Sequence, residues 1–265
     1  MENNKNIKNI DAANYNIESD NKFDDKLDSK KILKPKKGIL IVIEGLDSSG
    51  KETQVKMLYD KFLSKNLKVM KLQFPDYDSE SSTLVKMYLN GKLGSDPVLV
   101  NPYAASLFFA SDRYISYKLV WENYLEDGGI VIADRYVTSN MIYQAAKFEE
   151  NEQRLKFLDW LYDLEFNKLN LPKPDIVIFL NMPIKYCLKL GSNRLNKITG
   201  LKEKDIHEKN INYLLKTNDV AIEAAKIYKW EVINCIKDST VKSIEDINKE
   251  ILKIIENKLD GDLKF

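Results

Sequence analysis

Residues 45–54 have the types and spacing of a phosphate-binding loop, and they read Gly-Leu-Asp-Ser-Ser-Gly-Lys-Glu-Thr-Gln. Gly45 and Gly50 allow the backbone to curl so that successive N–H groups point toward phosphate oxygens. Lys51 adds a mobile positive charge, and the helix expected to follow adds the positive end of its dipole. An apolar run at 39–43 precedes the loop and supplies the strand–loop–helix context that this motif requires. The sequence therefore predicts phosphate binding at this loop.

One position departs from the pattern G-x-x-x-x-G-K-[ST]. Glu52 stands where a Ser or Thr hydroxyl would reach Mg²⁺, and the hydroxyl comes one residue later, at Thr53. A carboxylate beside nucleotide phosphates repels them unless Mg²⁺ or a lysine lies between. We therefore expect Glu52 to reach Mg²⁺ through water or to point to solvent.

Two charged residues follow the apolar run at 130–133. Asp134 lies where a carboxylate beside a phosphate-loop strand organises Mg²⁺, directly or through water. Arg135 would face phosphate, because a guanidinium binds phosphate oxygens through two parallel hydrogen bonds. An ion pair that caps the strand is the alternative, although two charges at a buried strand end are costly without a function.

Aromatic residues suggest where a nucleobase would lie. Phe109 and Arg113 are four residues apart within a helical pattern at 103–126, so they share one face of that helix. A ring beside a guanidinium can hold a base by stacking and by hydrogen bonds to its edge. Taken alone, Phe109 is more typical of the hydrophobic core than of a base-binding site. Phe74-Pro75-Asp76-Tyr77, after the run at 68–73, fits an ordinary turn equally well.

A glycine-punctuated basic segment, 191–208, joins two helical patterns. It contains Gly191, Arg194, Lys197, Gly200, Lys202, Lys204, Asp205, His207 and Glu208. Such a segment is typical of a lid that closes on a triphosphate and excludes water, and a solvated charge run is the alternative. His207 is the only histidine and has no nucleophile beside it, so we assign it no catalytic role.

The order of apolar runs predicts the fold class. Short, continuously apolar strands are expected at 39–43, 68–73, 130–133, 176–180 and 230–235. Helical patterns lie near 52–65, 81–90, 103–126, 138–148, 151–169, 184–195, 206–228 and 241–258. This alternation indicates an α/β protein with a five-stranded parallel sheet covered on both faces, in which the loops after the strands converge on one cleft. We expect a disordered tail at 1–37 and a single domain at 38–260.

Composition narrows the class of protein. The chain has 265 residues, 44% of them hydrophobic and 31% charged, with a formal net charge of +1. This balance gives no global field that would recruit nucleic acid or an anionic membrane, and no apolar stretch approaches the roughly 20 residues that span a bilayer. Cys187 and Cys235 lack metal-ligand spacing, and the tail lacks the features of a signal peptide or presequence. We expect a cytoplasmic protein without nucleic-acid or membrane partners.

Taken together, these motifs resemble thymidylate kinase, a nucleoside monophosphate kinase with the P-loop NTPase fold. The resemblance covers about residues 38–258. It rests on Glu44-Gly45-Leu46-Asp47, Phe74-Pro75, Phe109-x-x-x-Arg113, Asp134-Arg135-Tyr136, and Asn140 with Tyr143. It implies phosphoryl transfer from ATP to dTMP with Mg²⁺, in a homodimer whose contact could involve the helix at 103–126.

The resemblance also implies roles for individual residues. The donor phosphates would be bound by Gly45, Ser48, Ser49, Gly50, Lys51, Glu52 and Thr53. The acceptor dTMP would be bound by Asp47, Phe74, Tyr77, Phe109, Arg113, Arg135, Asn140 and Tyr143. At the base, Phe109 would stack on thymine, and Arg113 and Asn140 would approach its edge. At the sugar, Asp47 would accept a hydrogen bond from the 3′-hydroxyl, and Tyr143 would lie under the ring and disfavour a 2′-hydroxyl. At the phosphate, Arg135 and Tyr77 would make contact. Metal ligands would be Asp47, Asp134 and Glu52, and catalytic residues Lys51, Asp134, Arg135 and Arg194.

Two further points concern catalysis. Family members take a transition-state arginine from the loop or from the lid, and since Ser48 and Ser49 are not basic, the resemblance assigns this role to Arg194. An arginine often follows Phe-Pro in the family, whereas this chain has Asp76, which leaves the acceptor phosphate with less positive charge. We expect activity to be retained, because adenylate kinases, which read Gly-Lys-Gly-Thr-Gln, also lack a hydroxyl at the position of Glu52.

Two other functions stay open at this point. One is a kinase for another nucleoside monophosphate or for a deoxynucleoside. The other is a nucleotide-binding protein with weakened catalysis, which the unusual Glu52 and Asp76 would suit.

Overall fold

The computed structural model describes residues 37–192, 195–202 and 204–259. Its centre is a parallel five-stranded sheet with the order β2-β3-β1-β4-β5. The strands are β1 (Ile39–Gly45), β2 (Val69–Gln73), β3 (Ile130–Asp134), β4 (Ile176–Asn181) and β5 (Glu231–Asn234). The predicted α/β class and all five predicted strands are confirmed. The predicted tail at 1–37 lies, except for its last residue, outside the described residues.

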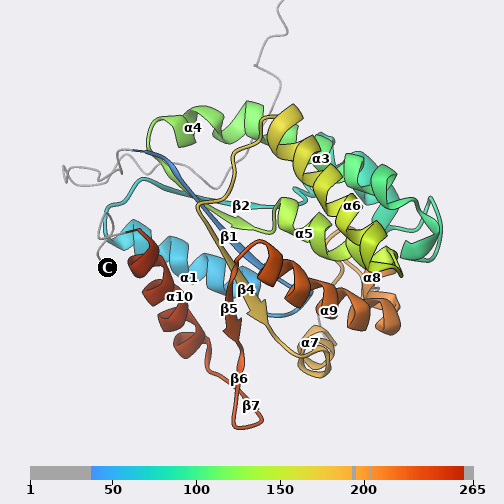
Figure 1. The fold of residues 1–265 in the computed structure, drawn as a ribbon. Coiled ribbons are helices and arrows are strands. Elements are labelled where there is room, and N and C mark those ends of the chain that lie inside the picture. The colour runs from blue at the N-terminus through green and yellow to red at the C-terminus, as the bar shows by residue number, and fades with distance from the viewer. Residues whose placement is uncertain (1–36, 193–194, 203, 260–265) are drawn as a thin grey trace, which may run out of the picture. The chain divides into compact units, whose positions relative to one another are not determined.

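Helices lie on both faces of the sheet (Figure 1). On one face, α1 (Lys51–Ser64) packs against α10 (Ile244–Lys258). On the other, α5 (Val137–Tyr143) packs against β1 and against the helices α3 (Pro102–Ser116), α6 (Asn151–Tyr162) and α9 (Ile211–Ile227). The remaining α-helices are α2 (Thr83–Leu89), α4 (Glu122–Glu126), α7 (Ile184–Gly191) and α8 (Ile206–Lys209). None of the described helices is long and apolar enough to cross a membrane.

Several predicted helices are interrupted. The pattern at 103–126 passes through a π-helical turn, η4 (Tyr117–Trp121), and the pattern at 151–169 ends in another, η6 (Asp163–Lys168). Each turn brings a side chain into the interior, Trp121 in the first and Glu165 in the second. The pattern at 206–228 divides at Asn210, whose side chain accepts a hydrogen bond from Tyr213 N and so starts a new helix.

The largest unpredicted element is a short hairpin of β6 (Ile236–Lys237) and β7 (Thr240–Val241). Asp238 and Ser239 both have positive φ there, as two-residue hairpin turns require. The last helix therefore begins at Ile244, three residues later than predicted, where Ser243 caps it. Three 3-10 turns are also present. η2 (Glu80–Ser82) overlaps the predicted helix at 81–90 and η5 (Ala145–Lys147) lies within that at 138–148, whereas η3 (Pro97–Leu99) was not predicted.

Sheet register determines which residues meet beyond the strand ends. Ile43 pairs with Asp134 of β3, and Gly45 pairs with Leu180 of β4. The loop after β1 therefore begins between the carboxyl ends of its two neighbours, where ligands bind in open α/β sheets.

Candidate active site

The loop between β1 and α1 curls as its glycines predict. Gly50 has φ +93° and caps α1, and a Cβ at Gly45 would lie 2.6 Å from Ser49 Oγ, so a side chain is excluded there. The Lys51 Nζ donates a hydrogen bond to the loop carbonyl of Leu46 at 2.7 Å. The buried Ser49 Oγ meets no hydrogen-bond partner among the described residues. The loop thus brings a lysine and a hydroxyl without a described partner to the end of β1.

The pKa of Lys51 is lowered to about 8, mainly by burial and next by the charge of Arg135. Asp134, Asp47 and Glu44 act in the opposite direction. An added phosphate would restore the preference for the ammonium form.

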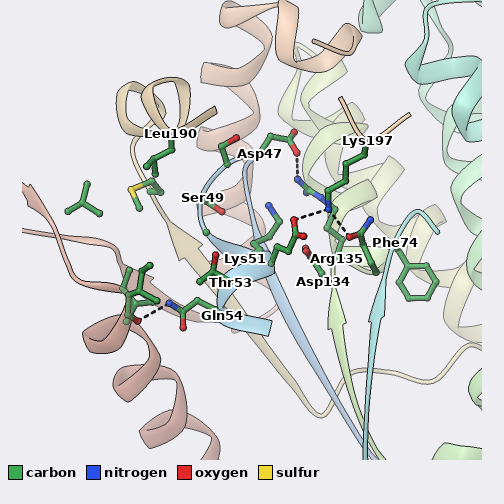
Figure 2. A pocket seen from close by; sticks show the side chains of 18 of the residues that line it. Asp47, Ser49, Lys51, Thr53, Gln54, Phe74, Asp134, Arg135, Leu190 and Lys197 are labelled. Atoms are coloured by element: carbon green, nitrogen blue, oxygen red, sulfur yellow. Dashed lines mark hydrogen bonds and ion pairs between the residues drawn. The ribbon is translucent and has the colours of Figure 1, made fainter. Parts of the chain in front are cut away.

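A cavity of about 550 Å³ opens in front of the loop (Figure 2). Residues 47–54 line it together with Asp134 and Arg135. The hairpin and the start of α10 line it as well, through Val241, Lys242, Ile244 and Ile247, none of which the sequence indicated. Gln54 joins this wall to the loop helix, since its Nε2 donates to Ile244 O at 2.9 Å and its Oε1 accepts from Asn248 Nδ2 at 3.0 Å.

Asp134 ends β3 inside this cavity. Its side chain is buried, and its Oδ1 has no hydrogen-bond partner in the described part of the chain. That free carboxylate oxygen suits a hydrated Mg²⁺, which keeps several waters and takes one or two carboxylates alongside substrate phosphates.

Arg135 joins the two halves of the site. Its backbone has φ +69°, an uncommon conformation for a residue other than glycine, and such strain is concentrated at functional sites. Its Nη1 donates to Glu44 Oε1 at 3.2 Å and to Gly45 O at 3.1 Å, and its Nη2 donates to Asp47 Oδ1 at 2.6 Å. Arg135 is therefore held against the phosphate loop.

Glu44 is a site residue to which the sequence gave no role of its own. It is fully buried, and its Oε2 accepts hydrogen bonds from Thr138 Oγ1 at 2.7 Å and Ser139 Oγ at 2.8 Å. Its Oε1 accepts from Gly45 N at 2.9 Å as well as from Arg135. Through these contacts Glu44 ties the guanidinium of Arg135 to the start of the loop and to α5.

A second, smaller cavity adjoins the first. The structure brings together there all eight residues predicted to bind an acceptor: Asp47, Phe74, Tyr77, Phe109, Arg113, Arg135, Asn140 and Tyr143. The Tyr143 hydroxyl donates to Asp47 Oδ2 at 2.9 Å, which ties α5 to the phosphate loop. His207, Asp205 and Gln144 also line this cavity.

Arg113 is oriented by a partner that the sequence did not reveal. Its Nε donates to Glu165 Oε2 at 2.8 Å, its Nη2 contacts Glu165 Oε1, and both side chains are buried. Gln144 is also buried, and its side-chain amide lies beside the Tyr88 hydroxyl without forming a well-aligned hydrogen bond to it. A buried amide placed in this way can offer a donor and an acceptor to the edge of a base.

The predicted lid contributes at least one residue to the loop cavity. Lys197 Nζ lies 3.0 Å from Glu52 Oε2 and donates to Gln73 Oε1 at 2.7 Å (Figure 2). Lys202 and Lys204 are exposed. Arg194, the predicted transition-state arginine, lies outside the described residues.

Known proteins with similar sequences belong to one family. A sequence model of the family described as thymidylate kinase matches residues 43–251. The probable thymidylate kinase of Pyrococcus horikoshii is 31% identical over 231 residues, which cover 85% of this chain and 99% of that protein. The thymidylate kinase of Schizosaccharomyces pombe is 30% identical, with 84% of this chain and 94% of that protein covered.

A solved thymidylate kinase structure shares the fold of this chain. The thymidylate kinase of Candida albicans superposes with a TM-score of 0.63 at 25% identity, covering 85% of this chain and 94% of that one. The family resemblance drawn from the motifs and the predicted P-loop NTPase fold are both confirmed. The chain belongs to the thymidylate kinase family.

Proposed function

We propose that this chain transfers the terminal phosphoryl group of ATP to dTMP, giving dTDP and ADP. The observation that carries the proposal is the junction of the two cavities. Asp47, Phe74, Pro75, Tyr77 and Arg135 line both of them, so a ligand on the phosphate loop and a ligand in the smaller cavity would meet there.

The larger cavity suits the donor. The loop N–H groups, Ser49 Oγ and Lys51 would bind the phosphates, and the wall from β7 and α10 would flank the rest of the nucleotide. Mg²⁺, when bound, would neutralise phosphate charge, and the free Oδ1 of Asp134 is the group that fits it. Asp47 is a weaker candidate ligand, because its two oxygens already accept hydrogen bonds from Arg135 and Tyr143.

The smaller cavity suits the acceptor nucleotide. Phe109 would stack on the base, and Asn140, Gln144 and Arg113 would read its edge. Asp47 and Tyr143 would face the sugar.

The chemistry requires alignment more than proton transfer. A phosphate monoester has a second pKa of about 6, so the attacking oxygens are mostly ionised at neutral pH. No general base is needed, and catalysis consists of bringing two anions together and neutralising their charge. Arg135 would hold the acceptor phosphate at the junction, Tyr77 would contact it, and Lys51 would hold the donor.

We also propose that the chain forms a homodimer. Large apolar side chains are exposed along α3 and η4, with Leu107 at 46%, Ile115 at 38% and Leu119 at 62% exposure. They recur at intervals of four or eight residues and so form a stripe on one side of the helix. An apolar stripe of this kind is typical of a protein–protein contact.

A coupled assay of ADP formation tests the reaction across dTMP, dUMP, dCMP, dGMP, AMP and thymidine. The proposal expects dTMP to give the highest kcat/KM. The breadth of the panel matters because the Candida albicans enzyme is described as having broad substrate specificity. ADP formation with AMP or dCMP but not with dTMP would refute the proposal. Nucleotide binding without turnover on any acceptor would favour a binding protein instead.

A further inference from the structure

His207 occupies a place that its sequence context did not suggest. It lies on α8, at the end of the basic segment 191–208, and is only 5% exposed. It lines the smaller cavity together with Phe109 and Asn140. The chain thus buries its only histidine in the wall of the acceptor site.

The backbone and the ring of His207 are both fixed. Asp205 Oδ1 accepts hydrogen bonds from His207 N and Glu208 N, each at 2.9 Å, which holds the first turn of α8. The imidazole Nε2 shares a hydrogen bond of 2.8 Å with the Tyr88 hydroxyl on α2. Burial, and next the nearby Lys147, lower the pKa of His207 to about 3, so the ring is neutral at physiological pH.

The neutral ring lies flat against Tyr143. The two ring centroids are 5.1 Å apart and the planes differ by 13°. The Arg135 guanidinium carbon lies over the Tyr143 ring as well, 5.2 Å from its centroid. Tyr213 also lies near this ring, with centroids 6.5 Å apart and planes tilted by 48°, so among the described residues His207 is the ring that stacks on Tyr143. In this plane the Tyr143 hydroxyl donates to Asp47 Oδ2.

We propose that His207 is a positioning residue of the acceptor site, acting through Tyr143. This inference rests on the proposed function, because it takes the smaller cavity as the place of the acceptor. The Tyr88 hydroxyl hydrogen-bonds the imidazole, and the imidazole stacks on the Tyr143 ring. The orientation of that ring then sets the shape of the cavity wall and the position of the hydroxyl bound to Asp47. Without the imidazole, Tyr143 has no stacked neighbour on that face and can rotate into the space left behind. This chain of contacts ends at Asp47 and does not include Ser49 Oγ or Lys51, the loop groups that would bind the donor, so donor binding should depend on it much less than acceptor binding.

The test compares dTMP and ATP affinities by calorimetry in full-length variants. His207→Ala is expected to weaken dTMP binding about tenfold and to leave ATP binding within about twofold of the wild type. His207→Phe keeps a stacking ring and is expected to restore most of the dTMP affinity. Tyr88→Phe removes only the hydroxyl and should weaken dTMP binding about threefold, which keeps the proposal testable if His207→Ala does not fold.

A double-mutant cycle shows whether the effect passes through Tyr143. In a Tyr143→Ala background, His207→Ala should change dTMP affinity by less than about twofold, because the ring that it positions is gone. An unchanged tenfold effect in that background would overturn the proposal. So would equal losses of dTMP and ATP affinity, or wild-type dTMP binding in both His207→Ala and Tyr88→Phe. A wild-type chain that binds dTMP but forms no ADP would refute the proposed function while leaving this comparison intact.

Discussion

Lys197 Nζ lies 3.0 Å from Glu52 Oε2, so the carboxylate that departs from the phosphate-loop pattern is paired with a lysine of the segment 191–208. The same ammonium group donates to Gln73 Oε1 at 2.7 Å, inside the cavity where the donor phosphates would lie. The Glu52 carboxylate thus binds the Lys197 ammonium group, which a donor phosphate in this cavity would also bind. From the sequence alone, we expect Glu52 to contact Mg²⁺ through water or to face solvent. The ion pair with Lys197 does not test that expectation, which stays a prediction.

Replacing Glu52 distinguishes two roles for its carboxylate, which are competition with phosphate for Lys197 and binding of Mg²⁺. If the carboxylate competes with phosphate for Lys197, Glu52→Gln should tighten ATP binding about two- to fivefold, as expected from the modest strength of an exposed ion pair. If the carboxylate holds Mg²⁺, the same change should weaken binding of Mg-ATP. Calorimetric titration with ATP and Mg²⁺ gives the sign directly.

Two variants serve as controls for this measurement. Asp60→Asn removes a carboxylate from an exposed pair with Lys56 on the same helix, away from the cavity, and should leave ATP affinity unchanged. In a Lys197→Met background, Glu52→Gln should no longer tighten binding. Tightening that persists there would point to direct repulsion between Glu52 and the phosphates and not to competition.

The parts of this molecule that the sequence revealed are those set by local chemistry. Continuous apolar runs specify the five strands, and Gly45 and Gly50 specify a loop that other residues cannot form. The order of the strands then brings Asp134 next to that loop, because parallel strands end at the same edge of the sheet.

The remaining site residues depend on contacts between distant segments. Glu165 meets Arg113 across 52 positions, and the hairpin ending at Val241 meets a loop that begins near residue 45. No local periodicity encodes such meetings. The sequence did not predict the π-helical turns either. The apolar pattern at 103–126 is helical throughout and does not show where one extra residue is inserted into the helix.

The Arg113–Glu165 pair should be important for stability, because both side chains are buried. Glu165→Gln leaves a buried guanidinium without a compensating charge, so the free energy of unfolding should fall by about 3–5 kcal/mol. Chemical denaturation monitored by tryptophan fluorescence measures it. Glu152→Gln, in the exposed pair with Lys156, should leave stability nearly unchanged. Similar small losses in both variants would show that the buried pair is not a stabilising contact.

Glu44 should control the orientation of Arg135. Glu44→Gln removes the charge that Arg135 Nη1 contacts but keeps a side chain of similar size. We expect kcat/KM for dTMP to fall about tenfold to a hundredfold, since a displaced guanidinium no longer aligns the acceptor phosphate. Steady-state kinetics with varied dTMP and saturating ATP measure the change. A variant with wild-type kcat/KM and reduced stability would assign Glu44 a structural role only.

The proposed dimer depends on the apolar stripe of α3 and η4. Leu119→Glu places a charge at its most exposed leucine, and we expect the variant to sediment as a monomer. Leu63→Glu changes an exposed leucine of α1, which packs on the opposite face of the sheet, and should leave the association state unchanged. Sedimentation velocity compares the three proteins. A wild-type chain that sediments as a monomer would contradict the proposal.

The lowered pKa of Lys51 predicts how donor binding depends on pH. The ammonium form is lost as the pH rises through about 8, whereas an ordinary lysine keeps its charge to about 10.5. Phosphate binds the charged form, so ATP affinity should be constant below pH 7 and should fall between pH 8 and pH 9.5, estimated from roughly one unit on either side of that value. Lys51→Arg carries a charge that does not titrate in this range, and its ATP affinity, although weaker, should stay flat. Equilibrium titrations from pH 6.5 to pH 9.5 measure both proteins, over roughly the range in which a lysine with this pKa changes charge. Parallel curves would mean that a group other than Lys51 sets the pH dependence.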